Sequence, residues 1–440
     1  MGYVPHTPDE IRHMLGRIGV PSVDALFETI PESLRSKAGL DLGEAAAERT
    51  LIAELRERAA QNLGTSSATC FLGAGAYAHF IPAAVDALAS RGEFTTAYTP
   101  YQAEISQGTL QAVYEFQTLI CQLAGLDVAN ASLYDGASAT AEAALMAMRV
   151  RRRQRVLLSA GLHPHWAHVV RTYLDGLGAQ VDVLPTGPDG RTLPAKIDDD
   201  VAAVVIQYPN FLGCVEDLAS FSEAAHASKA LLVSATAEPL ALAVLQAPGA
   251  LGADVACGEA QSFGVPLSFG GPQVGFLAAR QELVRQLPGR LIGETVDSGG
   301  QRAFVMTLTT REQHIRRERA TSNICTNQGL CALRVAIYLA LLGRRGLRKL
   351  ALANLSLAQY ARGALSDAGL ELPYSAPVFN EFVVRGPGLG ERHAALLERG
   401  LVAGLHLGPY DATLRDHLLI CTTELVGRDD IDRLARELSA

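Results

Sequence analysis

The sequence predicts an α/β protein whose core is a mostly parallel β-sheet covered by helices. Between about residues 66 and 325, short strands rich in Val, Leu and Ala alternate with helix-like stretches. Strands separated by a helix run parallel and are buried on both faces, so they read as nearly continuous apolar runs. Ligands bind beyond the carboxyl ends of such strands, so the loops at those ends are the candidate sites. The predicted strands are 155–160, 179–185, 201–209, 229–235 and 253–259.

We expect three domains in chain order. Residues 1–65 form a helical N-terminal arm, whose first helix begins with Thr7 as its cap and Pro8 at its first position. Residues 66–325 form the large α/β domain. An apolar helix at 327–343 then leads into a smaller C-terminal α+β domain, residues 326–440, with strands at 381–386 and 417–425.

The composition excludes several classes of protein. The 440 residues carry a net charge of −8, so no basic surface for nucleic acid or anionic membrane is expected, and the basic runs 149–155 and 311–319 are read as solvated helix faces. The seven cysteines form no CxxC pair and no zinc-binding spacing, which indicates a reducing compartment, no metal site and a cytoplasmic protein. No stretch reaches the roughly 20 apolar residues of a membrane span, and the first ten residues have no signal-peptide core.

Three features lie at or just beyond predicted strand ends. Asp135 and Gly136 open an Ala-rich helix whose free N–H groups suit an anion, although the same turn also suits a plain structural junction. His163 follows the strand at 155–160, where its imidazole either stacks on a planar ring or hydrogen-bonds within its loop. Glu238 follows the strand at 229–235, where its carboxylate either pairs with a pyridinium nitrogen or caps the next helix.

The stretch GEAQSFGVPLSFGGPQVGF, residues 258–276, is the fourth such loop. A helix start for phosphate, a ring-stacking His, a post-strand carboxylate and a strand-end loop are, in this order, the working parts of a fold-type-I pyridoxal-phosphate (PLP) enzyme. That enzyme holds its coenzyme through a lysine amine, whereas this loop presents Gln261, whose delocalised amide forms no imine. The chain's four lysines lie elsewhere, at Lys37, Lys196, Lys229 and Lys349.

The sequence therefore predicts a degenerate coenzyme site. Asp135 lies where a phosphate would bind, and two anions in one poorly solvated space repel each other by several kcal/mol. We expect no catalytic residue and no covalently bound coenzyme in this chain. The degenerate coenzyme site comprises Asp135, Gly136, His163, Glu238 and Gln261.

Four long motifs resemble the P-protein (glycine decarboxylase) family of the glycine cleavage system. They lie in the family's order over nearly the whole chain, at 97–143, 206–218, 258–280 and 310–328. The match is to the amino-terminal half of that protein, which in many prokaryotes is a separate chain, subunit 1. The resemblance implies the aminotransferase-like, fold-type-I architecture. It also implies that PLP is carried by the homologous subunit 2, because the lysine is absent from this half of the family generally.

The resemblance implies a reaction and a set of partners. Glycine is decarboxylated on the PLP of subunit 2, and the aminomethyl remnant passes to the lipoyl group of the H-protein. The enzyme is glycine dehydrogenase (aminomethyl-transferring), EC 1.4.4.2, with subunits 1 and 2 as obligate partners in an α2β2 heterotetramer. This chain supplies the wall that faces the coenzyme.

Two loops and a basic segment are candidates for that wall. In the stretch YTPYQAEISQG (98–108), the apolar positions Ile105, Leu110, Val113, Phe116, Ile120 and Leu123 have helical spacing, which leaves the polar residues before them free. The glycines of LSFGGP (267–272) allow a close backbone approach to the partner's PLP phosphate. Packing at a subunit seam, an ordinary turn and surface solvation are the respective alternatives. The candidates are Tyr98, Thr99, Tyr101, Gln102, Glu104, Ser268, Gly270, Gly271 and Arg311, with Arg316 and Arg317.

Two other functions compete with this interpretation. A self-sufficient PLP decarboxylase or transaminase needs a lysine where Gln261 stands. A non-catalytic scaffold protein with a degenerate PLP-enzyme fold gains nothing from keeping the polar loop 98–108. Glycine-dependent carbon dioxide exchange, measured with and without subunit 2, separates the three possibilities.

Overall fold

The computed structural model describes residues 5–39, 43–65, 67–95 and 98–439. Its chain divides into two compact units, Met1–Leu63 and Gly64–Ala440. The first unit contains α1 (Pro8–Ile18), η1 (Asp24–Phe27), α2 (Glu32–Arg35) and α3 (Glu48–Ala59). As predicted, Thr7 caps α1, and its side chain and that of Glu10 form a capping box. Residues 1–4, 40–42, 66, 96–97 and 440 of the expected domains lie outside the described residues, as does the first residue of the motif 97–143.

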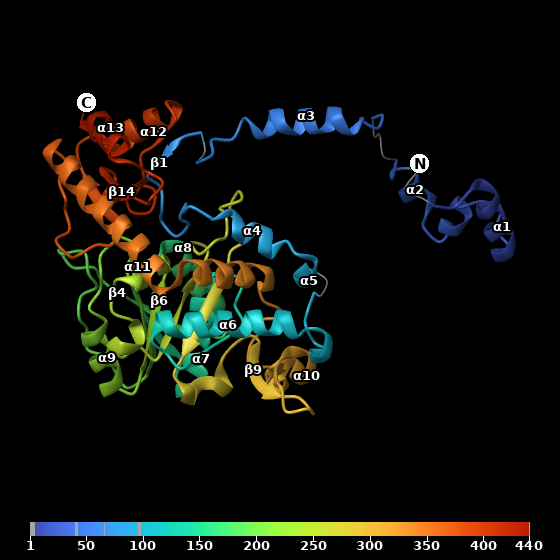
Figure 1. The fold of residues 1–440 in the computed structure, drawn as a ribbon, viewed down its shortest axis with the longest axis horizontal. Helices are drawn as coiled ribbons and strands as arrows, with labels where there is room; N and C mark the ends of the chain where they lie inside the picture. The colour runs from blue at the N-terminus through green and yellow to red at the C-terminus, as the bar shows by residue number, and fades with distance from the viewer. Residues whose placement is uncertain (1–4, 40–42, 66, 96–97, 440) are drawn as a thin grey trace. The chain divides into compact units, whose positions relative to one another are not determined.

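The second unit is built on a seven-stranded sheet (Figure 1). Its strand order is β2-β8-β7-β6-β5-β3-β4, and β3 to β7 are parallel while β8 and β2 join antiparallel. The mostly parallel sheet predicted from the apolar runs is confirmed. The strands are β2 (Val128–Ala129), β3 (Arg155–Ser159), β4 (Gln180–Leu184), β5 (Val201–Gln207), β6 (Leu231–Thr236), β7 (Val255–Glu259) and β8 (Gly275–Ala279).

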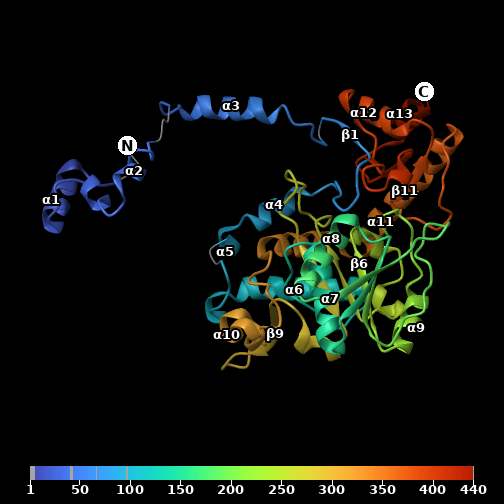
Figure 2. The same cartoon turned by 180° about the vertical axis from the view of Figure 1, so that it is seen from behind.

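Helices cover both faces of this sheet (Figures 1 and 2). Along β5, Ala203 and Val205 pack in the cluster that holds α7 and α8, whereas Val204 and Ile206 pack with α9. Successive side chains of a strand point to opposite faces, so an all-apolar strand is what a sheet covered on both sides requires. The helices are α6 (Gln107–Ala124), α7 (Gly136–Arg151), α8 (Pro164–Asp175) and α9 (Leu218–Ala227).

A long helix, α11 (Gly329–Asp367), connects this sheet to a second one. It extends well beyond the predicted 327–343, with a non-helical residue at Gly343 where two helical segments meet. The second sheet is antiparallel, in the order β11-β14-β13, and packs with α12 (Leu389–Glu398) and α13 (Arg428–Ser439). Its strands are β11 (Glu381–Arg385), β13 (Leu405–His406) and β14 (His417–Cys421).

The remaining elements are short. β1 (Thr69–Cys70) pairs in parallel with β12 (Leu401–Val402), so the chain just after residue 67 is attached to the region of the second sheet. β9 (Leu291–Val296) and β10 (Arg302–Thr307) form an antiparallel pair. The others are α4 (Ala83–Ala89), α5 (Gly92–Thr95), α10 (Gln313–Arg316), η2 (Ala103–Ile105), η3 (Pro239–Ala243), η4 (Pro248–Leu251), η5 (Gln281–Gln286), η6 (Thr309–Arg311), η7 (Arg317–Arg319) and η8 (Ala412–Leu414).

The prediction that Ile105 belongs to the apolar face of this helix is wrong. Leu110, Val113, Phe116 and Ile120 are buried on α6 as expected, but Ile105 is 78% exposed. The reason is that α6 begins at Gln107, so Ile105 lies in η2 before the helix and outside its apolar stripe.

Candidate functional site

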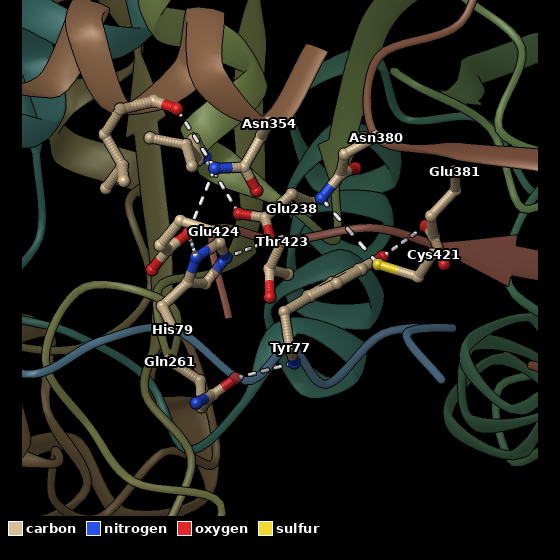
Figure 3. Close-up of polar contacts among 12 residues, drawn as sticks. Tyr77, His79, Glu238, Gln261, Asn354, Asn380, Glu381, Cys421, Thr423 and Glu424 are labelled. Carbon is tan, nitrogen blue, oxygen red and sulfur yellow. Dashed lines mark hydrogen bonds and ion pairs between the residues drawn. The ribbon is translucent and has the colours of Figure 1, made fainter. Parts of the chain in front are cut away.

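Gln261 lies two residues beyond β7, and both the oxygen and the nitrogen of its side-chain amide are hydrogen-bonded within the chain. It is 3% exposed. Its Nε2 donates to the Val265 carbonyl (2.6 Å), and its Oε1 accepts from the Tyr77 backbone N–H (3.0 Å). The residue therefore ties its own loop to a segment 184 positions earlier in the chain, as Figure 3 shows for the Tyr77 contact.

The start of α7 already holds an anion of the protein. Asp135 caps the helix through its Oδ1, which accepts from the Ser138 N–H at 2.6 Å. The Gly136 N–H donates to Glu259 Oε2 at 3.0 Å. Two carboxylates of the protein, those of Asp135 and Glu259, therefore lie at the start of this helix. A Cβ added to Gly136 would lie 2.4 Å from the Trp166 ring, which shows how little space remains there. The predicted repulsion named Asp135 alone and missed Glu259.

Glu259 is buried and satisfied by backbone groups. Besides Gly136, its carboxylate accepts from the N–H groups of Gln261 (3.0 Å) and Val274 (2.8 Å). Burial raises the pKa of Glu259 to about 7, although these hydrogen bonds favour the charged form. A group that lies in the same GEAQ stretch as Gln261 thus takes the helix N-terminus at which a phosphate would bind.

His163 is enclosed by the protein's own rings and backbone. It caps α8, its Nδ1 accepts from the His165 N–H (3.1 Å), and its Nε2 donates to the Ala74 carbonyl (2.9 Å). Burial lowers the pKa of His163 to about 4, so the ring is neutral. Trp166 stacks on it with centroids 6.0 Å apart, and a Cβ on Gly75 would lie 3.0 Å from the imidazole. The imidazole of His163 therefore stacks on a ring of the protein and also accepts a hydrogen bond within its own loop.

Glu238 follows β6 and uses both carboxylate oxygens. Its Oε1 accepts from the Leu240 N–H (3.0 Å), which is the predicted cap, here of η3. Its Oε2 accepts from His79 Nε2 at 3.0 Å, and the other ring nitrogen of His79 donates to Glu424 Oε2 at 2.9 Å (Figure 3). Burial alone would lower the pKa of His79, but the two carboxylates raise it to about 10, so the imidazole is a cation.

The degenerate coenzyme site does not fit PLP. Gln261 offers no amine, Glu259 holds the helix start, and Ala74 and Gly75 lie against His163. The cavity lined by Tyr77, Glu238 and Glu381 has a volume of about 10 Å³, which is at most enough for one water molecule. No step of a reaction is therefore assigned to a coenzyme in this chain.

Tyr98, one of the other predicted residues, lines a larger cavity of about 580 Å³. Pro272, the last residue of the predicted loop LSFGGP (267–272), lines it as well. The remaining walls come from α6 and from the start of α11, and they include Asn327 and Gln328. Tyr98 is 90% exposed, and Phe269, at the tip of the loop, is 91% exposed. The structure thus brings the two predicted loops to the same cavity.

Arg290 is the cavity residue that the sequence did not reveal. It is 6% exposed, donates to Thr326 Oγ1 (3.2 Å) and Asn327 Oδ1 (3.1 Å), and lies with its guanidinium 5.7 Å from the Tyr101 ring centre. Among the described residues its Nε finds no hydrogen-bond acceptor, since the nearest Glu312 oxygen is 3.9 Å away. The sequence feature that could have indicated Arg290 is its place as a lone arginine between a Pro-Gly turn and an apolar strand.

The predicted Arg311 is buried and bonded to backbone. Its guanidinium donates to the carbonyls of Leu287, Gly289 (3.2 Å) and Leu308 (3.1 Å). The carbonyls of Leu287 and Gly289 lie just before Arg290 in the chain, so Arg311 holds the segment that leads into Arg290. The other candidates, Gln102, Glu104, Ser268, Gly270, Arg316 and Arg317, are exposed, while Thr99 and Gly271 are half-buried.

The described residues contain neither a membrane-spanning helix nor a cluster of metal ligands. None of the helices there is long and apolar enough to cross a membrane. Within the same residues, no three His, Cys, Asp or Glu side chains come together in a way that would hold a metal ion.

Comparisons with known proteins agree with these observations. The family model described as "Glycine cleavage system P-protein" matches residues 1–438. A relative from Anaeromyxobacter dehalogenans, called "Probable glycine dehydrogenase (decarboxylating) subunit 1", is 52% identical over 99% of both chains.

Solved structures extend the comparison to the fold. A glycine decarboxylase (P-protein) of the glycine cleavage system, in inhibitor-bound form, superimposes with a TM-score of 0.92 and is 47% identical, covering 100% of this chain and 99% of that one. A sphingosine-1-phosphate lyase of Burkholderia pseudomallei, 17% identical, superimposes with a TM-score of 0.62 over 91% of this chain and 92% of its own. The predicted fold-type-I architecture is confirmed.

The closed site predicts that restoring the lysine will not restore coenzyme binding. In Gln261→Lys, Glu259 still holds the helix start and the backbone at Ala74 still covers His163. After incubation with PLP and borohydride reduction, peptide mapping should find no pyridoxyl adduct at position 261, as in the wild-type control. A stoichiometric adduct at that position would show that the site is open.

Proposed function

Because the chain belongs to the glycine cleavage system P-protein family, we propose that it is the subunit of glycine decarboxylase that binds no coenzyme. Together with a second subunit it decarboxylates glycine and transfers the aminomethyl group to the lipoyl group of the H-protein. The relatives' designation as subunit 1 supports the division into two chains. The observation that carries the proposal is Gln261, buried and bonded on both sides of its amide where the family fold would place a reactive lysine.

In this proposal PLP resides in the second subunit, where it stabilises the negative charge left by decarboxylation. The residues of this chain bind and orient the reactants. Arg290 is suited to a glycine carboxylate, because it lines the cavity and its guanidinium is permanently charged. Tyr98 and Tyr101 flank it, and Arg311 positions it through the carbonyls of Leu287 and Gly289.

The exposed loops around the cavity are proposed to contact the second subunit. Tyr98 and Phe269 are large apolar side chains that are almost fully exposed, and such side chains are characteristic of protein–protein interfaces. Ser268, Gly270 and Gly271 lie beside Phe269 and are proposed to reach the partner's coenzyme. Gln102 and Glu104 complete the rim, and the complex is proposed to be an α2β2 heterotetramer. A non-catalytic scaffold is the alternative, and the assay below distinguishes it.

Activity should appear only when both subunits are present. We expect the chain alone to show no glycine-dependent exchange of labelled carbon dioxide with H-protein, and the chain coexpressed with subunit 2 to show it. Subunit 2 alone is the matched control and should be inactive. Activity of the isolated chain, or inactivity of the correctly assembled pair, would contradict the proposal.

Tyr101→Phe should slow the assembled enzyme without dissociating it. The substitution keeps the ring beside Arg290 and removes only the hydroxyl, whose hydrogen bond to a reactant is worth about 1 kcal/mol, or roughly a fivefold change in turnover. Steady-state exchange rates and size-exclusion chromatography provide the two readouts. Tyr410→Phe, at another half-exposed tyrosine outside the cavity, serves as the control. Unchanged kinetics would remove Tyr101 from the site.

A further inference from the structure

We infer that residues 73–80, GAGAYAHF, are an internal substitute for the coenzyme, so that this chain permanently closes its own degenerate site. Each group that would hold a coenzyme is bonded instead to this segment or to Glu259, and Figure 3 shows two of these contacts, Gln261 with Tyr77 and Glu238 with His79. The inference concerns this chain alone and does not depend on the proposed activity.

The first half of the segment is fixed against His163 and the second sheet. Ala74 and Gly75 both have positive φ values, 57° and 98°, and this turn brings the Ala74 carbonyl to His163. The Ala74 N–H donates to Glu381 Oε1 at 2.6 Å. A side chain at Gly73 would collide with Glu381 and Cys421, since an added Cβ would lie 2.5 Å from the carboxylate. Position 73 therefore accommodates only glycine, which has no side chain to collide with these groups.

The second half is extended and alternates between inside and outside. Tyr77 and His79 point inward and are buried, whereas Phe80 is 63% exposed. The Tyr77 N–H meets the Gln261 amide, and its hydroxyl donates to Glu381 Oε2 at 2.7 Å. His79 donates to Glu238, the carboxylate for which pairing with a pyridinium nitrogen is one of the two alternatives that the sequence leaves open.

His79 reproduces the chemistry of that missing ring. A protonated imidazole, like a pyridinium, is a flat aromatic cation with an N–H that a carboxylate can accept. Its second N–H is accepted by Glu424, which is itself held by the Phe80 N–H (2.7 Å) and by Asn354 Nδ2 (3.0 Å). The cation thus contacts Glu238, whose side chain is 3% exposed, and Glu424, whose side chain is 17% exposed, and replacing His79 leaves Glu238 buried without a counter-charge.

Hydrogen exchange on the wild-type chain tests the closure directly. The amides of Ala74, Tyr77 and Phe80, which donate to Glu381, Gln261 and Glu424, should be protected from exchange, and added PLP at millimolar concentration should leave the exchange of residues 73–80 unchanged. Rapid exchange in this segment, or protection that increases with PLP, would overturn the inference. The measurement needs no variant.

His79→Ala tests the role of the ring. The variant should unfold at a temperature lower by about 5 °C or more, because two carboxylates lose their partner. Imidazole at about 0.1 M should recover much of that loss, since a small aromatic cation can occupy the vacated space. In the control His168→Ala, at an exposed histidine, both the loss and the recovery should be negligible. A stable His79→Ala variant, or one that imidazole does not stabilise, would contradict the assigned role.

The pH profile distinguishes a cation from a neutral ring. The folded pKa of His79, about 10, exceeds its ordinary value of 6.5, so its contribution to stability is full below pH 6.5 and is lost as the pH rises through 10. In the alkaline range the wild type should therefore lose stability more steeply than His79→Gln. Equal slopes would show that the imidazole is neutral. The facing titratable groups, present in both proteins, are Glu238, Glu424, Glu381, Tyr77, Tyr338 and Cys421.

Discussion

The closed site depends on one constraint, which is that a buried carboxylate must be partnered. Glu238, Glu259 and Glu381 all lie in the interior near the carboxyl ends of the parallel strands, where leaving one unpaired costs several kcal/mol. The chain supplies every partner itself, through the His79 cation, the Tyr77 hydroxyl and backbone N–H groups. These partners fill the volume between the carboxylates, and this is why the degenerate coenzyme site has no space for a coenzyme.

The same fold therefore presents two different regions. Beyond β7 the interior is closely packed, and a cavity of only about 10 Å³ remains near Glu238. Around loops 98–104 and 268–271 it has a cavity of about 580 Å³ with a buried arginine and exposed aromatic side chains. In the proposed pair of homologous subunits, the second chain would carry the coenzyme and this chain would supply a rigid facing wall. A filled interior helps in that role, because a wall that positions reactants must not yield.

Local patterns predicted much of this, and long-range pairing explains what they missed. Apolar runs located the parallel strands, and Gln261 in place of a lysine is the local feature from which we expect no coenzyme in this chain. Glu259 and His79 escaped notice because their roles appear only when distant segments meet: His79 and Glu424 lie 345 positions apart. Ile105 was misplaced because helical spacing does not specify where a helix begins.

The coenzyme content of the purified complex with the second subunit tests the central claim most directly. After borohydride reduction, the account predicts one PLP per pair of unlike chains, with the whole label on the second subunit. Two PLP per pair, or a label on any lysine of this chain at stoichiometric level, would contradict it.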